Sequence, residues 1–247
     1  MGNKKVYFVS DVHLGASYIR DPRAHERRFV SWLKRVGPTA GAIYLLGDVL
    51  DYWFEYREVV PRGYVRLFGA LAELSDAGVE ITWLKGNHDI WIFDYLPGEL
   101  GIRVVDGALE EEILGRRFFL EHGDGVGRKS LGFRLIRSVF RNRVAQKLFS
   151  GIHPRWTVPF AHRWSSSSRA GGKAEGEGSL VGPLLDFSAR YASAHPSVDY
   201  FVYGHLHEAL ERDVPGSKAK MFVLGDWIER FTYGVFDGHE FRLLSDE

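Results

Sequence analysis

Five short apolar runs in the sequence each end in side chains that can bind a metal ion. A single histidine at the end of a strand is usually an ordinary loop residue, but five repetitions of the same event indicate one shared site. The sequence has no cysteine, so such a site would be built from histidine, aspartate and asparagine. The candidate groups are Asp11 and His13 after 6–10, Asp48 after 43–46, Asn87, His88 and Asp89 after 81–84, His122 and Asp124 after 118–120, and His205 and His207 after 200–203.

These residue types suit a pair of divalent ions. Two ions about 4 Å apart can stabilise an in-line displacement at phosphorus and activate water near neutral pH. Such a site needs one carboxylate shared by both ions, and Asp48 is the candidate for that position. A mixture of nitrogen and oxygen ligands favours Mn²⁺, Fe²⁺ or Zn²⁺ over Mg²⁺ or Ca²⁺. We expect Asp11, His13 and His207 to complete one ion, and Asn87, His122 and His205 to complete the other.

Further polar residues lie next to the predicted ligands in sequence. His88 directly follows Asn87, so we expect both to lie at the substrate phosphate, with His88 stabilising developing charge or protonating the leaving group. Asp226 is interpreted as closing the last strand of the motif series, and His25 as an ordinary structural or surface histidine. The carboxylates expected to orient ligand histidines are Asp51, Asp89 and Asp124.

Length and charge restrict the class of protein. The 247 residues suit one large domain, or one domain with an insertion. The 32 basic and 32 acidic residues give no net charge, so the composition does not support a nucleic-acid partner. The N-terminus lacks the pattern of a signal peptide, and no apolar run is long enough to span a membrane. We expect a cytoplasmic protein of undetermined oligomeric state.

Alternating strand and helix patterns place the candidate ligands at strand ends. We expect strands at 5–10, 42–46 and 79–84, and helices at 21–36 and 64–77. This order alone favours one open parallel sheet, whose functional residues gather at the carboxyl ends of the strands. The second half of the chain predicts a hairpin at 108–114 and 117–120, strands at 200–203 and 221–224, and a final hairpin at 232–236 and 240–244.

A segment of different composition separates the His122 and His205 motifs. Residues 128–149 have the pattern of one amphipathic helix with a basic surface, and 165–178 are rich in serine and glycine and expected to be mobile. We therefore expect an inserted helical cap at 125–178 between the two parts of a catalytic domain, 1–124 and 179–247. A basic run is equally typical of a solvated helix face. The candidate substrate-binding residues of this segment are Arg128, Phe133, Arg137, Phe140 and Arg169.

The order and spacing of the five motifs resemble the signature of the calcineurin-like metallophosphoesterases. The matching blocks are Asp11-x-His13, Gly47-Asp48-x-x-Asp51, Gly86-Asn87-His88-Asp89, His122-Gly-Asp124 and Gly204-His205-x-His207. The resemblance covers about residues 6–227. It implies an α/β fold, an αββα sandwich of two mixed sheets flanked by helices, in place of the single open sheet.

Within that superfamily the chain resembles the UDP-2,3-diacylglucosamine diphosphatases of lipid A biosynthesis. The resemblance rests on Ser10-Asp-Val-His13-Leu, 47–53, the basic helical insertion and Leu224-Gly-Asp-Trp227. It implies cleavage of a nucleotide-lipid diphosphate to UMP and 2,3-diacylglucosamine 1-phosphate, with manganese as the usual metal, by an enzyme peripheral on the inner membrane. His88 departs from the family, whose best-described branch has arginine after the metal-binding asparagine.

Two alternatives stay open at this point. His88 is the residue of general phosphoesterases and favours a phosphodiesterase or phosphatase acting on a nucleotide or phosphoprotein. A metal-bound scaffold that binds a partner without turnover is the other alternative. Scaffolds tend to lose ligands, whereas this sequence keeps the full set.

Overall fold

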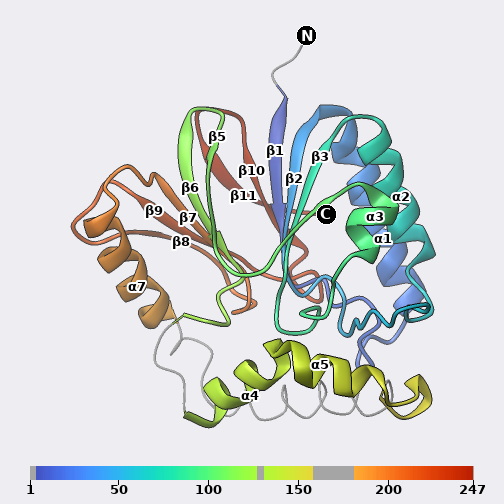
Figure 1. Ribbon diagram of the computed structural model, residues 1–247. Coiled ribbons are helices and arrows are strands. Elements are labelled where there is room, and N and C mark those ends of the chain that lie inside the picture. Colours follow the sequence, from blue (N-terminus) through green and yellow to red (C-terminus); the bar gives the residue numbers. More distant parts are fainter. Residues whose placement is uncertain (1–3, 127–130, 158–180, 247) are drawn as a thin grey trace.

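The computed structural model describes residues 4–126, 131–157 and 181–246 (Figure 1). The elements of the N-terminal part are β1 (Lys5–Val9), α1 (Pro22–Val36), the 3₁₀ helix η1 (Gly37–Thr39), β2 (Ala40–Leu46), α2 (Val65–Asp76), β3 (Glu80–Leu84), α3 (Tyr95–Leu100) and β4 (Arg103–Val105). The remaining elements are β5 (Leu109–Ile113), β6 (Arg116–Glu121), α4 (Leu131–Arg141), α5 (Arg143–Ser150), α7 (Val181–Ala194), β7 (Tyr200–Tyr203), β8 (Ala209–Asp213), β9 (Lys220–Leu224), β10 (Thr232–Phe236) and β11 (Phe241–Ser245).

The strands of the described residues form two sheets. One has the order β11-β10-β1-β2-β3-β4, and the other has the order β5-β6-β7-β9-β8. The expected αββα sandwich is confirmed, and the single open sheet favoured by element order alone is wrong. Element order misleads because the β5–β6 hairpin starts a second sheet, in which β6 pairs in parallel with β7.

The core has layers between the sheets and on their outer faces. Side chains of β1 alternate between layers: Val6 and Phe8 face the other sheet, while Tyr7 and Val9 face α1 and α2. Phe8 stacks on Phe118 of β6 with ring centroids 5.5 Å apart, which joins the two sheets. In Figure 1, α1, α2 and α3 cover the outer face of one sheet and α7 covers that of the other. Burial on both faces explains why these strands read as continuous apolar runs.

Helix α1 has the limits that the sequence indicates. The Asp21 side chain accepts a hydrogen bond from the Ala24 N–H at 2.9 Å, and Pro22 occupies the first turn. The predicted apolar face is buried, with Phe29 and Trp32 inaccessible to solvent. The residues that mark the ends of α1 and its wide apolar face were therefore sufficient to predict this helix from local sequence.

The expected single helix at 128–149 is wrong, because the structure has two helices there. Asn142 lies between α4 and α5 in extended backbone, and its side chain accepts hydrogen bonds from the N–H groups of Val144 and Ala145 at 2.9 and 3.1 Å. Asparagine is a strong N-cap residue, so it starts a new helix inside an otherwise continuous apolar period. Figure 1 shows α4 and α5, here called the cap helices, lying across the end of the sandwich at which β1, β2 and β3 terminate.

Four short elements of the described residues were not predicted, namely η1, α3, β4 and β8. Strand β8 is an edge strand paired only on one side with β9, and its residues are exposed or half-buried. It therefore lacks the apolar run that marks the buried strands. Among the described residues, no helix is both long and apolar enough to cross a membrane.

Candidate metal centre

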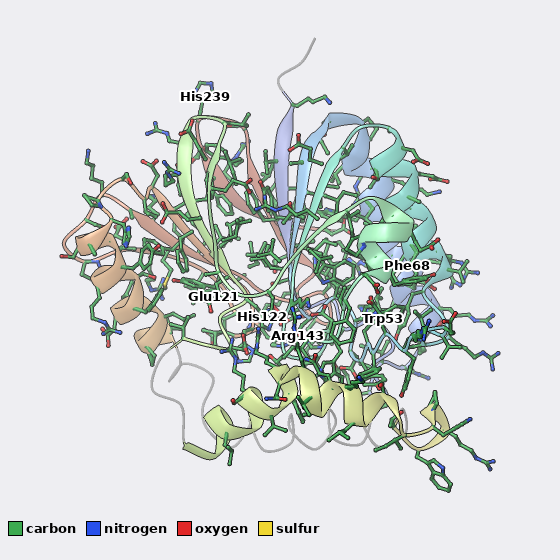
Figure 2. The ribbon with its side chains drawn as sticks, viewed as in Figure 1. Trp53, Phe68, Glu121, His122, Arg143 and His239 are labelled. Atoms are coloured by element: carbon green, nitrogen blue, oxygen red, sulfur yellow. The ribbon has the colours of Figure 1, made fainter. Side chains whose placement is uncertain are left out.

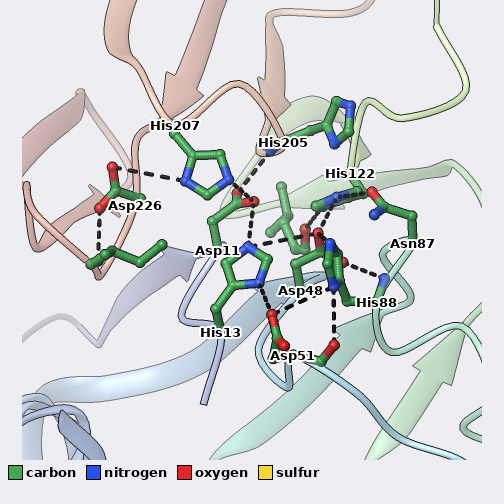
Figure 3. Close-up of polar contacts among 12 residues, drawn as sticks. Asp11, His13, Asp48, Asp51, Asn87, His88, His122, His205, His207 and Asp226 are labelled. Atoms are coloured by element: carbon green, nitrogen blue, oxygen red, sulfur yellow. Dashed lines mark hydrogen bonds and ion pairs between the residues drawn. The ribbon is translucent and has the colours of Figure 1, made fainter. Parts of the chain in front are cut away.

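The loops that follow β1, β2, β3, β6 and β7 meet at one end of the sandwich (Figure 3). Each loop leaves the carboxyl end of a strand in one of the parallel pairs. The topology therefore brings residues as distant in sequence as Asp11 and His205, 194 positions apart, into contact. The structure brings together Asp11, His13, Asp48, Asn87, His88, His122, His205 and His207, as the sequence predicts.

One group of potential ligands is centred on Asp11. Its Oδ1 atom lies 3.6 Å from His13 Nε2 and 3.5 Å from His207 Nε2. Asp11 and His13 are fully buried. One ligand atom from each of these three residues lies within 4.8 Å of the others, a spacing that suits a shared ion.

The second group is Asp48, His122 and His205, whose ligand atoms also lie within 4.8 Å of one another. His122 Nε2 is 3.2 Å from Asp48 Oδ2 and 3.3 Å from Asn87 Oδ1. His122 Nδ1 donates to the Leu46 carbonyl at 2.8 Å, because a carbonyl only accepts, and this hydrogen bond directs Nε2 into the site.

Asp48 lies between the two groups. Its Oδ2 atom is 3.8 Å from His13 Nε2 in the first group and 3.2 Å from His122 Nε2 in the second. Its Oδ1 atom accepts a hydrogen bond from the His88 N–H at 2.8 Å, which fixes the carboxylate plane. This is the arrangement that a carboxylate shared by two ions requires.

The electrostatics of the site fit bound cations. Burial opposes ionisation of Asp11 and Asp48, yet neighbouring histidines lower the pKa of both carboxyl groups below the usual range. Burial, with the nearby His122, lowers the pKa of His205 to about 4, so this imidazole is neutral and able to bind metal. Asp11 Oδ1 is buried and accepts no hydrogen bond from the described residues. Burial also opposes protonation of His122, but in contrast the Asp48 carboxylate raises the pKa of His122, so a proton on His122 balances the buried charge that a bound ion would balance instead. Buried carboxylates with nearby imidazole nitrogens fit the predicted divalent ions.

The backbone at the ligands is strained. Positive φ angles are uncommon for residues other than glycine, and they cluster at functional sites held by their surroundings. Backbone hydrogen bonds provide this support, from the His13 N–H to the Asp48 carbonyl at 2.9 Å and from the Trp227 N–H to the Asp11 carbonyl at 3.1 Å. The ligand candidates with positive φ are Asp11, His13, Asp48, His205 and His207.

Two glycines of the motifs are required by close approach. A Cβ atom on Gly47 would lie 2.7 Å from His122 Nδ1 and 2.6 Å from the Gly86 nitrogen. A Cβ atom on Gly204 would lie 2.6 Å from Ser10 Oγ and 2.7 Å from Asp11 Oδ2. The loops that carry the candidate ligands can therefore approach one another this closely only because residues 47 and 204 are glycines, which have no Cβ atom.

His88 lies at the edge of the two groups. Its Nδ1 donates to the Asp51 carbonyl at 3.0 Å, and its Nε2 lies 3.9 Å from Asp48 Oδ2. The ring packs edge-on against His13, with centroids 4.8 Å apart. Burial lowers the pKa of His88 below its ordinary value. This position fits a group that acts on the substrate phosphate beside the ions, and the catalytic role of His88 stays a prediction.

The three carboxylates predicted to orient histidines have different contacts. Asp51 Oδ1 lies 3.3 Å from His13 Nδ1, which is the contact that the prediction requires. Asp89 instead accepts from the N–H groups of Val49 and Gly86, at 3.0 and 2.7 Å, and so holds two ligand loops together. Asp124 forms an ion pair with Arg137 of α4.

Two supporting residues were missed from the sequence. Asp226 Oδ2 lies 3.9 Å from His207 Nδ1 (Figure 3), while its Oδ1 accepts backbone N–H groups of the turn that follows. His25 donates from Nε2 to the Val12 carbonyl at 2.7 Å, between the ligands Asp11 and His13. A signal for His25 was present: it lies four residues before Phe29 on the apolar face of α1.

The structure describes only part of the predicted substrate-binding set. Arg128, Arg169 and the side chain of Phe133 lie outside the described residues. Phe140 packs against Trp91 with ring centroids 5.3 Å apart, and its carbonyl accepts from Trp91 Nε1 at 2.9 Å. The substrate-binding role of all these residues stays a prediction.

The fold and the two ligand groups fit a hydrolase with a dinuclear metal centre. When bound, the two ions would supply positive charge for a phosphoryl transition state and a nucleophile near neutral pH. The chain itself would supply Asp48 as the shared carboxylate, the other Asp, Asn and His side chains as terminal ligands, and the neighbouring imidazole of His88.

Comparisons with known proteins agree with this class. The family model described as calcineurin-like phosphoesterase matches residues 4–209, and the chain belongs to this family of metal-dependent phosphoesterases. A UDP-2,3-diacylglucosamine hydrolase of Porphyromonas gingivalis is 41% identical to it, with 98% of each chain covered. Proteins of the same name from Hahella chejuensis and Stenotrophomonas maltophilia are each 28% identical, covering 96% and 90% of this chain and 96% and 91% of theirs.

Proposed function

We propose that this protein hydrolyses the diphosphate of UDP-2,3-diacylglucosamine, releasing UMP and 2,3-diacylglucosamine 1-phosphate. The observation that carries the proposal is the relative of that name, which is 41% identical over 98% of both chains. The two ligand groups supply the chemistry, and Mn²⁺ is the metal that the donor set and the family resemblance favour. The catalytic domain would comprise 1–124 and 179–247, with 125–178 as an inserted cap.

The substrate is tested by a screen of purified protein with Mn²⁺ against UDP-2,3-diacylglucosamine, cyclic dinucleotides and p-nitrophenyl phosphates, with mass spectrometry of the products. We expect the nucleotide-lipid to have the highest kcat/KM and to yield UMP and the lipid phosphate. A higher kcat/KM for a cyclic dinucleotide would overturn the proposed substrate while leaving the metal centre in place.

His88 favours one alternative, a general metal-dependent phosphodiesterase or phosphatase. Its imidazole lies 3.9 Å from the shared carboxylate, close enough to act on a phosphate bound at the ions. The relatives' name weighs against this alternative, and the same screen decides between the two.

We further propose that the cap helices and the turn after them contact the membrane that holds the acylated substrate. Large apolar side chains are exposed there. One pair in α4 and one pair in α5 are spaced by four residues, which places each of these two pairs on one side of its helix, and two more lie in the segment after α5. Two of them, Leu148 and Trp156, are 72% and 69% exposed. An exposed apolar surface beside cations is typical of proteins that bind the surface of an anionic bilayer. The apolar residues are Leu135, Val139, Val144, Leu148, Ile152 and Trp156, and the exposed basic residues beside them are Arg143, Lys147 and Arg155.

Replacing Leu148 and Trp156 by serine is expected to reduce co-sedimentation with anionic phospholipid vesicles. Binding should weaken because the variant buries less apolar area in the bilayer. Salt should weaken the remaining binding, because each basic side chain contributes roughly 1 kcal/mol to the attraction to an anionic surface. Leu114→Ser is the matched control, since Leu114 is 49% exposed at the β5–β6 turn, at the far end of the sandwich (Figure 1). Equal binding of the double variant and the control would contradict membrane contact through this surface.

A further inference from the structure

Arg137 of α4 reaches the loop that carries the ligand His122. Its Nε atom donates to Asp124 Oδ2 at 2.8 Å, and its Nη2 lies 3.5 Å from Asp124 Oδ1. The Asp124 side chain is 3% exposed and that of Arg137 is 31% exposed. A two-point ion pair with one buried partner is stronger and more directional than most surface pairs.

Gly125 makes room for the guanidinium group. A Cβ atom at this position would lie 2.8 Å from Arg137 Nη2 and 3.1 Å from Glu121 Oε1. The Arg137 side chain therefore lies against the backbone of the loop, beside the carboxyl groups of Asp124 and Glu121. Figure 2 shows Glu121 and His122 at the end of the sandwich that faces the cap helices.

Other contacts attach α4 to loops of the six-stranded sheet. Trp91, which follows β3, donates to the Phe140 carbonyl, and Arg141 forms an ion pair with Asp106, which follows β4. Asp124 follows β6 of the other sheet. With the pair of Arg137 and Asp124 added to these contacts, α4 is attached to loops of both sheets. It therefore lies across the end of the sandwich where the candidate metal ligands gather.

We propose that Arg137 and Asp124 form a latch that fixes the cap helices over the metal centre and so positions the acylated part of the substrate. In this proposal Arg137 positions the cap helices, whereas the sequence predicted that it contacts the substrate. The attachment of α4 to the Asp124 loop does not depend on the proposed function. Only the effect of the latch on substrate choice rests on that function.

The latch predicts faster amide hydrogen exchange in α4 when the pair is broken. Arg137→Gln and Asp124→Asn should each raise exchange across 131–141 by about tenfold or more, since hydrogen bonds to charged groups are among the stronger side-chain contacts. The double variant should exchange no faster than either single variant. Arg242→Gln is the control, because it breaks the 3.1 Å pair of Arg242 with Asp237 at the β10–β11 turn, beside His239 and at the end of the sandwich opposite the cap helices (Figure 2).

Gly125→Ala provides a test that keeps both charges. The added methyl group should displace the guanidinium and raise exchange in α4 as Arg137→Gln does. In all three single variants, kcat/KM for UDP-2,3-diacylglucosamine should fall about tenfold more than kcat/KM for bis(p-nitrophenyl) phosphate, chiefly through KM, with bound metal unchanged.

Exchange in α4 that stays at the wild-type rate in Arg137→Gln and Gly125→Ala would overturn the latch. Loss of metal in Asp124→Asn, together with equal losses on both substrates, would also overturn it, because Asp124 would then act through His122. If the protein does not hydrolyse the nucleotide-lipid, the exchange measurements still decide the latch, so its failure is distinguishable from failure of the proposed function.

Discussion

Asp48→Ala is expected to abolish hydrolysis and to leave at most one metal ion per chain. The carboxylate lies 3.8 Å from His13 Nε2 and 3.2 Å from His122 Nε2, so its removal takes a ligand from both groups. Two ions stabilise a phosphoryl transition state by several kcal/mol, and each 1.36 kcal/mol is tenfold in rate, so the loss should exceed about 10³-fold. The measurements are turnover with saturating Mn²⁺ and metal content by mass spectrometry.

Asp213→Ala is the matched control, because Asp213 is an exposed carboxylate of the edge strand β8. It should keep wild-type activity and metal content. Full activity of Asp48→Ala, with two ions still bound, would contradict a centre built around a shared carboxylate.

His88→Ala is expected to lower kcat by about 10²- to 10⁴-fold with metal content intact. The Asp51 carbonyl accepts from Nδ1, so a protonated His88 presents its second N–H on Nε2, toward the site. If this group protonates the leaving group, the loss should be smaller for bis(p-nitrophenyl) phosphate, whose leaving group needs no proton. The measurement is kcat for both substrates at saturating metal.

His239→Ala serves as the control for this prediction. His239 is exposed and lies at the end of the molecule opposite His122 (Figure 2), so its replacement should leave kcat unchanged. A loss of metal from His88→Ala that accounts for the whole loss of rate would make His88 a structural residue.

The elements with strong local signals could be predicted from the sequence. Asp21 and Pro22 mark the start of α1, and its apolar face identifies the buried side. The strands that carry the ligands are buried on both faces and read as unbroken apolar runs. Because parallel strands end at the same edge, their polar endings predict a common site without any knowledge of the sheet pairing.

Other features depend on contacts between distant residues, which sequence patterns do not reveal. Asn142 divides the cap helices through a local hydrogen bond that competes with a helix period running through it. Strand β8 forms because β9 offers an edge, although its own residues are mostly polar. The partners of Asp124 and Asp226 could not be predicted for the same reason. A carboxylate beside a ligand motif can bond a histidine, a backbone turn or an arginine on another element, and the sequence does not indicate which.

Metal titration of the wild-type protein tests the central claim most directly. The chelated protein is titrated with Mn²⁺ while bound metal per chain and hydrolysis of UDP-2,3-diacylglucosamine are followed together. A dinuclear centre made by the Asp11 and Asp48 groups predicts two bound ions per chain and activity that is complete only when the second is bound. Full activity with one ion per chain, or without any divalent metal, would contradict it.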